Sequence, residues 1–310
     1  MKQQPLKKDF YINIISFLLL LLITILIPPI QIFTVFCLPI PIILLMKAYG
    51  LKRTSVVMAI LLVTSMFVAP VLSFPLTALA LISGGMIGWS INHGQHPYET
   101  WAKGTAGFVL GLVLIYAYIE LILQVSIMSS FENTMDQSLQ MTEELFQGLG
   151  AGEQNFDLIR EQMTNMLQLL PVFLVAVSMA LAIITQWISY KVINKVYKQP
   201  LSFPPFRLFR LPKIILWIYF LTLIVSLFVA GDYSTLPSVA VWNVYHLAGL
   251  IIALQGLSFI FYYTHAKKQS KALPIISILV LVFFPSIGLY LLRILGIIDL
   301  GFDLRNRMAK

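Results

Sequence analysis

Charged residues are scarce in this sequence. Only 11% of its 310 residues are Asp, Glu, Lys or Arg, whereas a soluble domain of this length carries about 25%. Hydrophobic residues make up 59%, and the mean hydropathy is +0.87. This composition excludes an ordinary soluble globular protein and predicts an all-α, polytopic membrane protein.

Cysteine and acidic residues are also few. The single cysteine, Cys37, lies in an apolar run, so an intramolecular disulfide is excluded. Thirteen acidic residues stand against 21 Lys and Arg, which gives a net charge of +8. In a membrane protein this excess is typical of basic cytoplasmic loops, and we expect no nucleic-acid partner.

Nine apolar stretches approach the length of about 20 residues that a membrane-spanning helix needs. They are Phe10–Ile27, Ile30–Met46, Val56–Leu72, Pro75–Ile91, Thr105–Val125, Leu169–Tyr190, Ile214–Ala230, Val239–Tyr263 and Pro274–Leu295. The first has a basic start but no small-residue cleavage site, which favours an uncleaved span. Three others contain the breaks "LPIP" (38–41), "SGGMIG" (83–88) and "FPSIG" (284–288). Such breaks are typical either of proline kinks or of binding-site walls.

Basic residues fall in alternate loops and thereby predict the orientation. They lie before the first span, after the second, fourth and eighth, and between the sixth and seventh. The positive-inside bias places these loops and the N-terminus in the cytoplasm, and we expect the protein in a plasma membrane. Nine crossings would put the basic tail, with Arg305, Arg307 and Lys310, outside. Alternatively, the segment Pro274–Leu295 re-enters at "FPSIG" and returns, which leaves eight spans; the sequence leaves both alternatives open.

Seven of the 13 acidic residues fall between Ser126 and Leu170. Apolar residues recur there at steps of three and four on both sides of "GLGAG" (148–152), which is typical of two amphipathic helices joined by a glycine turn. We predict an extracytoplasmic acidic helical hairpin over 126–170 whose helices continue the neighbouring spans. Thr105–Leu145 would then be one helix of about 60 Å. The chain is thus read as one integral membrane domain, with 1–125 and 171–310 flanking the hairpin.

Ionisable side chains inside a membrane are costly and often functional. Four lie near the outer ends of the predicted spans: Glu120, His246, Arg293 and, in a loop, Asp232. We expect them to bind a small-molecule substrate in a polar pocket near the outer leaflet, with Glu120 facing Arg293 or His246. A purely structural ion pair is the alternative.

Sequence patterns for catalysis or metal binding are missing. "HGQH" brings His93 and His96 together, but no further Cys or His stands nearby to complete a tetrahedral site. We therefore expect no enzyme activity, metal or cofactor. Gly104, Gly107 and Gly111 share one face of the fifth span and favour close helix packing over ligand binding.

The loop 191–213 combines basic and aromatic residues on the predicted cytoplasmic side. Its end, "FPPFRLFRLPK" (203–213), is typical of an anchor on an anionic lipid surface. We expect the lipid bilayer as a partner, and a protein partner either at this loop or at the Phe- and Met-bearing stripe of the acidic hairpin.

The order of these features resembles the YybS-like family of predicted bacterial membrane proteins. The matching stretches are "LPIPIILLMKAYGLKR" (38–53), the glycine-bearing stretch Pro75–Ile91, the acidic insertion and "GIIDLGFDLRNR" (296–307). The resemblance covers the whole chain and implies a multi-pass bacterial membrane protein.

The first five predicted spans are also similar to the S components of energy-coupling-factor vitamin transporters. In both, a first helix leads to a short, proline-interrupted second helix and then to "AYG" or "LFG" before the third. This resemblance implies a small-solute-binding protein that docks on an ATP-driven partner. The first span here, Phe10–Leu26, has none of the AxxxA pairs that S components use for docking, and the spans after Tyr190 exceed the six of an S component.

Two functions remain as hypotheses. The first is small-solute binding or transport by a protein of S-component-like ancestry. The second is a non-transporting scaffold or regulator that holds an envelope or cytoplasmic partner.

Overall fold

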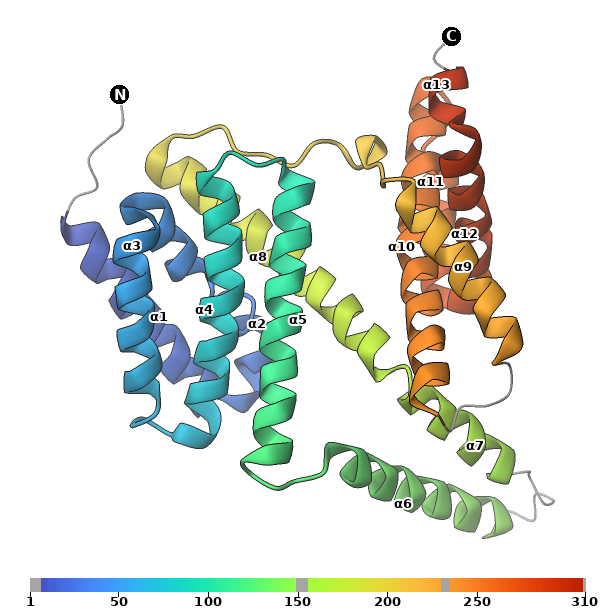
Figure 1. Ribbon diagram of the computed structural model, residues 1–310, viewed down its shortest axis with the longest axis horizontal. Coiled ribbons are helices and arrows are strands. Elements are labelled where there is room, and N and C mark those ends of the chain that lie inside the picture. Colours follow the sequence, from blue (N-terminus) through green and yellow to red (C-terminus); the bar gives the residue numbers. More distant parts are fainter. Residues whose placement is uncertain (1–6, 149–155, 230–234, 309–310) are drawn as a thin grey trace. The chain divides into compact units, whose positions relative to one another are not determined.

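The computed structural model describes residues 7–148, 156–229 and 235–308 (Figure 1). All regular elements within these ranges are helices. Six of them are long and apolar enough to cross a membrane: α1 (Lys7–Leu26), α4 (Pro70–Asn92), α5 (Pro97–Leu121), α8 (Leu170–Tyr197), α10 (Leu236–Ala266) and α12 (Pro285–Phe302). The all-helical class is confirmed, whereas the count of eight or nine spans stays a prediction.

The remaining helices are shorter, bent or amphipathic. They are the 3-10 turn η1 (Pro28–Ile30), α2 (Gln31–Thr34), α3 (Ile40–Ser65), α6 (Ile127–Gly148), α7 (Phe156–Leu167), the 3-10 turn η2 (Phe206–Leu208), α9 (Ile214–Phe228), α11 (Ala272–Phe283) and α13 (Leu304–Met308). The chain forms two compact units. The N-terminal unit comprises residues 1–160 and 174–203, and the C-terminal unit comprises 161–173 and 204–310.

In the N-terminal unit, α3 folds back on itself at Gly50. This residue has φ 74° and ψ 177°, a backbone conformation that suits glycine and breaks the helix. The carbonyl of Met46 accepts a hydrogen bond of 2.5 Å from Asn92 Nδ2 at the end of α4. The predicted second span is therefore no single helix, but a short α2 followed by the first half of α3.

Glycines on α5 allow α4 to approach closely. A Cβ added at Gly107 would lie 2.8 Å from the backbone of Ser83, and one at Gly104 would lie 2.8 Å from Ile87. Gly111 packs in the same way against the backbone and side chain of Leu79. These contacts place all three glycines in one tight helix–helix interface, as small residues commonly do in membranes.

The predicted 60 Å helix over Thr105–Leu145 is wrong. Helix α5 ends at Leu121, Gln124 adopts φ 53°, and α6 starts anew at Ile127 (Figure 1). Asp136 of α6 and Arg160 of α7 form an exposed ion pair of 3.0 Å, which contributes at most about 1 kcal/mol. Most of "GLGAG" lies outside the described residues, so the hairpin itself stays a prediction.

In the C-terminal unit, α10 and α12 run parallel. Along α10, Gly249 contacts Arg293, Ile252 contacts Gly296, and Gln255 donates a hydrogen bond to Asp299. The residue numbers of the contacting pairs increase in the same direction on both helices. The C-terminal ends of α10 and α12 therefore lie at the same end of the unit. Gly256 also touches the backbone of α12, which leaves no room for a side chain.

Helix α11 carries the chain back so that α12 can run parallel to α10. It has 12 residues and ends at Phe283, which gives it a length of about 18 Å. Pro285 then starts α12, which packs against α11 through the contact of Gly288 with Leu281. Helix α11 is therefore shorter than the roughly 30 Å hydrocarbon layer of a bilayer.

A buried ion pair ties the C-terminal tail to the basic loop. Arg305 Nε lies 2.9 Å from Asp299 Oδ2. Its Nη1 donates to the carbonyls of Arg207 and Phe209 at 2.8 and 3.0 Å, and its Nη2 donates to Ser258 Oγ at 3.2 Å. Burial lowers the pKa of the Arg305 guanidinium, but the nearby Asp299 carboxylate opposes this shift, and an arginine stays protonated in proteins.

These contacts place the tail at the end of the C-terminal unit that also holds the loop 204–213 and the last turn of α10. Whether the last segment crosses the membrane or re-enters and returns stays a prediction.

Candidate functional site

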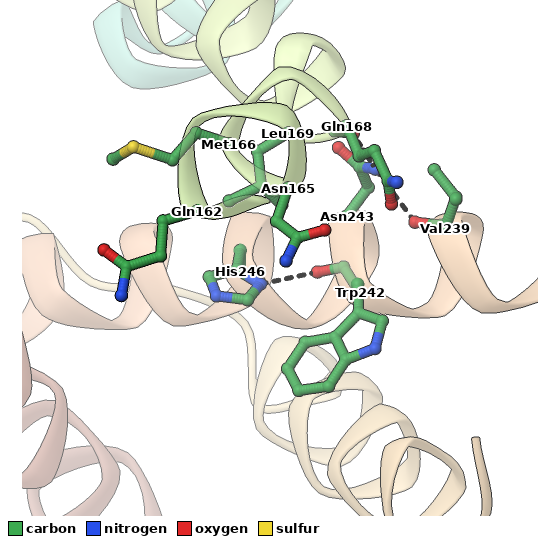
Figure 2. Close-up of a pocket in the computed structure, with 9 residues that line it drawn as sticks. All are labelled: Gln162, Asn165, Met166, Gln168, Leu169, Val239, Trp242, Asn243 and His246. Carbon is green, nitrogen blue, oxygen red and sulfur yellow. Dashed lines mark hydrogen bonds between the residues drawn. The ribbon is translucent and has the colours of Figure 1, made fainter. Parts of the chain in front are cut away.

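A cavity of about 360 Å³ lies between the C-terminal part of α7 and the N-terminal half of α10 (Figure 2). Its lining is rich in side-chain amides and holds one indole and one imidazole. The lining residues are Gln162, Asn165, Met166, Gln168, Leu169, Val239, Trp242, Asn243 and His246. Because all belong to the C-terminal unit, this unit builds the cavity alone.

Asn243 fastens the two walls together. Its Nδ2 donates hydrogen bonds of 2.8 Å to the carbonyl of Gln168, beyond the end of α7, and to the carbonyl of Val239 on its own helix. Two carbonyl acceptors identify this atom as the amide nitrogen, because nitrogen is the donor of the carboxamide. The Asn243 side chain is thereby held with its oxygen, Oδ1, in a defined position.

Two buried carboxamide oxygens of the lining have no hydrogen-bond partner within the described part of the chain. They are Oδ1 of Asn243 and Oε1 of Gln168. Asn243 is only 9% exposed. An unpaired buried acceptor of this kind costs about 1–3 kcal/mol, so an unpartnered pair at one cavity is a reason to look for a ligand there.

His246 contributes a third acceptor. Its Nδ1 lies 2.8 Å from the carbonyl oxygen of Trp242 (Figure 2), and since a carbonyl only accepts, Nδ1 must carry the proton. In the neutral imidazole the other nitrogen, Nε2, then holds a lone pair. The site therefore presents three hydrogen-bond acceptors that a ligand with O–H or N–H donors would pair, beside the N–H groups of the Gln162 and Asn165 carboxamides.

Aromatic rings fix the cavity floor on α10. The His246 ring packs 5.6 Å from the ring of Trp242 and 5.2 Å from that of Tyr245. Tyr245 in turn stacks on Tyr219 of α9, with ring centroids 5.1 Å apart. Tyr245, which packs against both His246 and Trp242, is thereby held by a neighbour on a second helix, α9.

Arg293 contacts the stacked rings of Tyr245 and Tyr219 but does not line the cavity. Its Nη1 donates to the Tyr245 hydroxyl at 3.3 Å, and its guanidinium lies 5.5 and 5.8 Å from the rings of Tyr245 and Tyr219. Arginine over aromatic faces gains cation–π attraction. Arg293 thus supports the tyrosines behind His246, a role that the sequence did not suggest.

Glu120 has a local role in the N-terminal unit. Its Oε1 accepts hydrogen bonds from the Tyr116 hydroxyl at 3.1 Å and from the backbone N–H of Ile127 at 3.2 Å. The carboxylate thereby bridges the break between α5 and α6 and meets the positive end of the α6 dipole. The predicted pairing of Glu120 with Arg293 or His246 involves two separate units and stays a prediction. Asp232 lies outside the described residues.

The histidines of "HGQH" also have local partners. His93 Nδ1 pairs with the Trp89 carbonyl at 2.8 Å, and His96 Nδ1 accepts from the Tyr98 backbone N–H at 3.3 Å at the start of α5. The His93 bond lies at the C-terminal end of α4, and the His96 bond caps the N-terminus of α5.

The amide wall of α7 is the part of the cavity that sequence reasoning missed. Gln162, Asn165 and Gln168 recur every three residues, which puts them near one face of a helix. The spacing is present in the sequence, among the acidic residues of the predicted hairpin.

Comparison with known proteins assigns the chain to a family. Residues 14–300 match the family described as "Predicted membrane protein (DUF2232)". The chain belongs to this family. A relative is similar over nearly the full length: the "Uncharacterized protein YybS" of Bacillus subtilis (strain 168) is 26% identical over 315 residues, which cover 99% of this chain and 100% of that protein. The predicted YybS-like family is therefore confirmed. No solved structure matches the chain significantly, so the likeness to S components stays a prediction.

Proposed function

We propose that this multi-pass membrane protein binds a small, neutral solute in the amide cavity as part of its uptake or transport. The observation that carries the proposal is the pair of buried carboxamide oxygens, Asn243 Oδ1 and Gln168 Oε1, without partners in the described chain. A ligand that donates O–H or N–H groups to them would remove the cost of leaving them unpaired.

The lining argues for a neutral ligand. None of the nine lining residues carries a carboxylate, an ammonium or a guanidinium group. A charged solute would lose its hydration without gaining a counter-charge, which is unfavourable in a membrane protein. Carboxamides together with an indole face suit a compact polyhydroxylated or amide-bearing molecule, for which the volume of about 360 Å³ leaves room.

The uptake part of the proposal draws on the sequence. The family is one of predicted membrane proteins, and the six long apolar helices agree with a location in a bilayer. The similarity of the first five predicted spans to S components favours solute binding coupled to an ATP-driven partner. In this proposal the membrane is the bacterial cytoplasmic membrane, with the N-terminus inside.

A ligand screen with paired variants tests the proposal. The purified protein is heated in neutral detergent with single neutral polyols, sugars and amides, and the unfolding midpoint is recorded. A true ligand should raise the midpoint of the wild type but not of Gln168→Ala, which removes one cavity acceptor. Gln140→Ala is the control, because Gln140 is an exposed glutamine on α6. A ligand that stabilises both variants equally would place its site elsewhere and overturn the proposal.

A scaffold or regulatory role is supported by a different observation. Helix α6 leaves apolar side chains exposed beside its acidic residues: Met141 and Leu145 are each 68% exposed, and Phe131 is 51% exposed. An amphipathic helix with an open apolar face could hold a partner. Co-purification of envelope proteins that is lost on deleting residues 132–161 would favour this role.

A further inference from the structure

A second cavity, larger than the amide cavity, lies at the tail end of the C-terminal unit. Its volume is about 810 Å³, and its walls come from the loop at 205–207, the last turns of α10, the turn at 268–269 and the first half of α11. We propose that this cavity binds the headgroup and upper acyl chain of an anionic phospholipid.

The rim of the cavity is cationic. Arg207, His265, Lys268 and Lys271 all line it, and none of the lining residues is acidic. Lys271 also stands at the start of α11, where the positive end of the helix dipole favours an anion. A phosphodiester would meet opposite charge here from Arg207 in the loop, from Lys268 after the end of α10 and from Lys271 at the start of α11.

The deeper wall of the cavity is apolar. On both α10 and α11, the lining residues change from basic at the rim to apolar farther in. Along α11, Lys271 is followed by Pro274, Ile275 and Ile278, all in the lining. These positions extend about 10 Å from the cationic rim. Ile275 is 55% exposed and Ile278 is 40% exposed.

Along α10, which runs the opposite way, Phe261 lies one turn inside His265. The polar end of each wall is therefore at the rim and the apolar end is within, which matches an amphiphile with its phosphate at the surface. A soluble anion has no apolar group that could pack against the apolar wall.

Lys268 gives an independent sign that a side chain is needed at the rim. It adopts φ 50°, a left-handed conformation that glycine accepts freely and other residues do not. The backbone N–H of Gln269 bonds to the Thr264 carbonyl at 2.9 Å, and that of Lys268 bonds to the His265 carbonyl at 3.2 Å. This is the helix ending at which glycine is the usual residue. The chain carries a lysine there despite the strain, and this lysine lines the cavity.

Lysine variants at adjacent positions test the proposal. Lys268→Gln and Lys267→Gln remove the same charge from neighbouring exposed residues, but only Lys268 lines the cavity. Lys268→Gly removes the charge and also relieves the backbone strain. The full chain is purified in neutral detergent, and unfolding midpoints are measured with phosphatidylglycerol, with phosphatidylcholine and with inorganic phosphate.

Phosphatidylglycerol should raise the wild-type midpoint more than phosphatidylcholine does, and inorganic phosphate should have little effect. The apparent affinity for phosphatidylglycerol should fall about five-fold in Lys268→Gln and Lys268→Gly but not in Lys267→Gln. Without lipid, Lys268→Gly should be at least as stable as the wild type.

Three outcomes would overturn the proposal. Equal responses to the two lipids would mean that the headgroup is not recognised. An equal response to inorganic phosphate would assign the cavity to a soluble anion. An equal loss in Lys267→Gln would show that only the general positive charge of this region attracts lipid.

Discussion

Replacing Asp299 by Asn should destabilise the C-terminal unit, because it leaves the Arg305 guanidinium buried without a counter-charge. The side chains of Asp299 and Arg305 are only 1% and 7% exposed. Breaking a buried pair by removing one charge costs about 3–5 kcal/mol.

The arrangement around Arg305 favours the lower end of this range. The asparagine oxygen can still accept from Arg305 Nε, and the donors to Arg207, Phe209 and Ser258 stay in place. We therefore expect a loss of about 3 kcal/mol in the free energy of unfolding.

A second Asp–Arg pair in the same unit supplies the control. Asp303 pairs with Arg210, but their side chains are 33% and 42% exposed, so Asp303→Asn should cost at most about 1 kcal/mol. Both variants are unfolded with SDS in mixed micelles and followed by circular dichroism. If Asp299→Asn loses no more stability than Asp303→Asn, the buried pair does not hold the tail as described.

Three further predictions concern topology and packing. Single cysteines at Asn306 and Lys267, in a cysteine-free background, should react with an impermeant maleimide from the same side of the membrane; reaction from opposite sides would support nine crossings. Gly107→Ala should lower the free energy of unfolding by about 1–3 kcal/mol through overpacking. Gly301→Ala should be tolerated, because its new Cβ would meet only an atom 3.8 Å away. Equal unfolding midpoints of the two variants would refute the close packing. Glu120→Leu should lower the unfolding midpoint while Glu120→Gln, which keeps an acceptor for the α6 backbone, should retain most of it; equal midpoints would remove the bridging role.

The helical membrane class could be predicted because it depends on local composition. Runs of apolar residues and the scarcity of charge need no tertiary information. Gly104, Gly107 and Gly111 could be placed on one face for the same reason, since helical periodicity alone brings them together.

The end of α5 could not be predicted in this way. Residues 122–126 contain neither Pro nor Gly, so no helix-breaking residue marks the break. It depends instead on Glu120, which accepts from the Ile127 backbone, and on Gln124, which takes a left-handed conformation. These are consequences of the fold rather than local preferences.

The return of the tail has a similar origin. Pro285 could be read either as a kink within a span or as a turn between two helices. The contact of Gly288 with the backbone of Leu281 decides between them, because residues seven apart in one continuous helix would lie about 10 Å apart. From the sequence alone, the positive-inside bias already conflicts with a basic tail on the outer side.

For the candidate site, sequence reasoning singled out His246 but not the residues that surround it. It weighed ionisable groups, whereas the cavity is lined by neutral amides contributed by a segment some 80 residues earlier in the chain. The packed structure determines which amide groups lack a hydrogen-bond partner. Asn243 is an example, because its nitrogen donates to the Gln168 carbonyl while its oxygen has no partner in the described chain.

Native mass spectrometry of the protein extracted from its own membrane tests the solute-binding proposal most directly. The wild type should carry a neutral small molecule that is released on collisional activation, and Gln168→Ala should carry much less of it at equal folding, while Gln140→Ala should match the wild type. A wild type without any bound small molecule, or a ligand retained equally by both variants, would contradict the proposal.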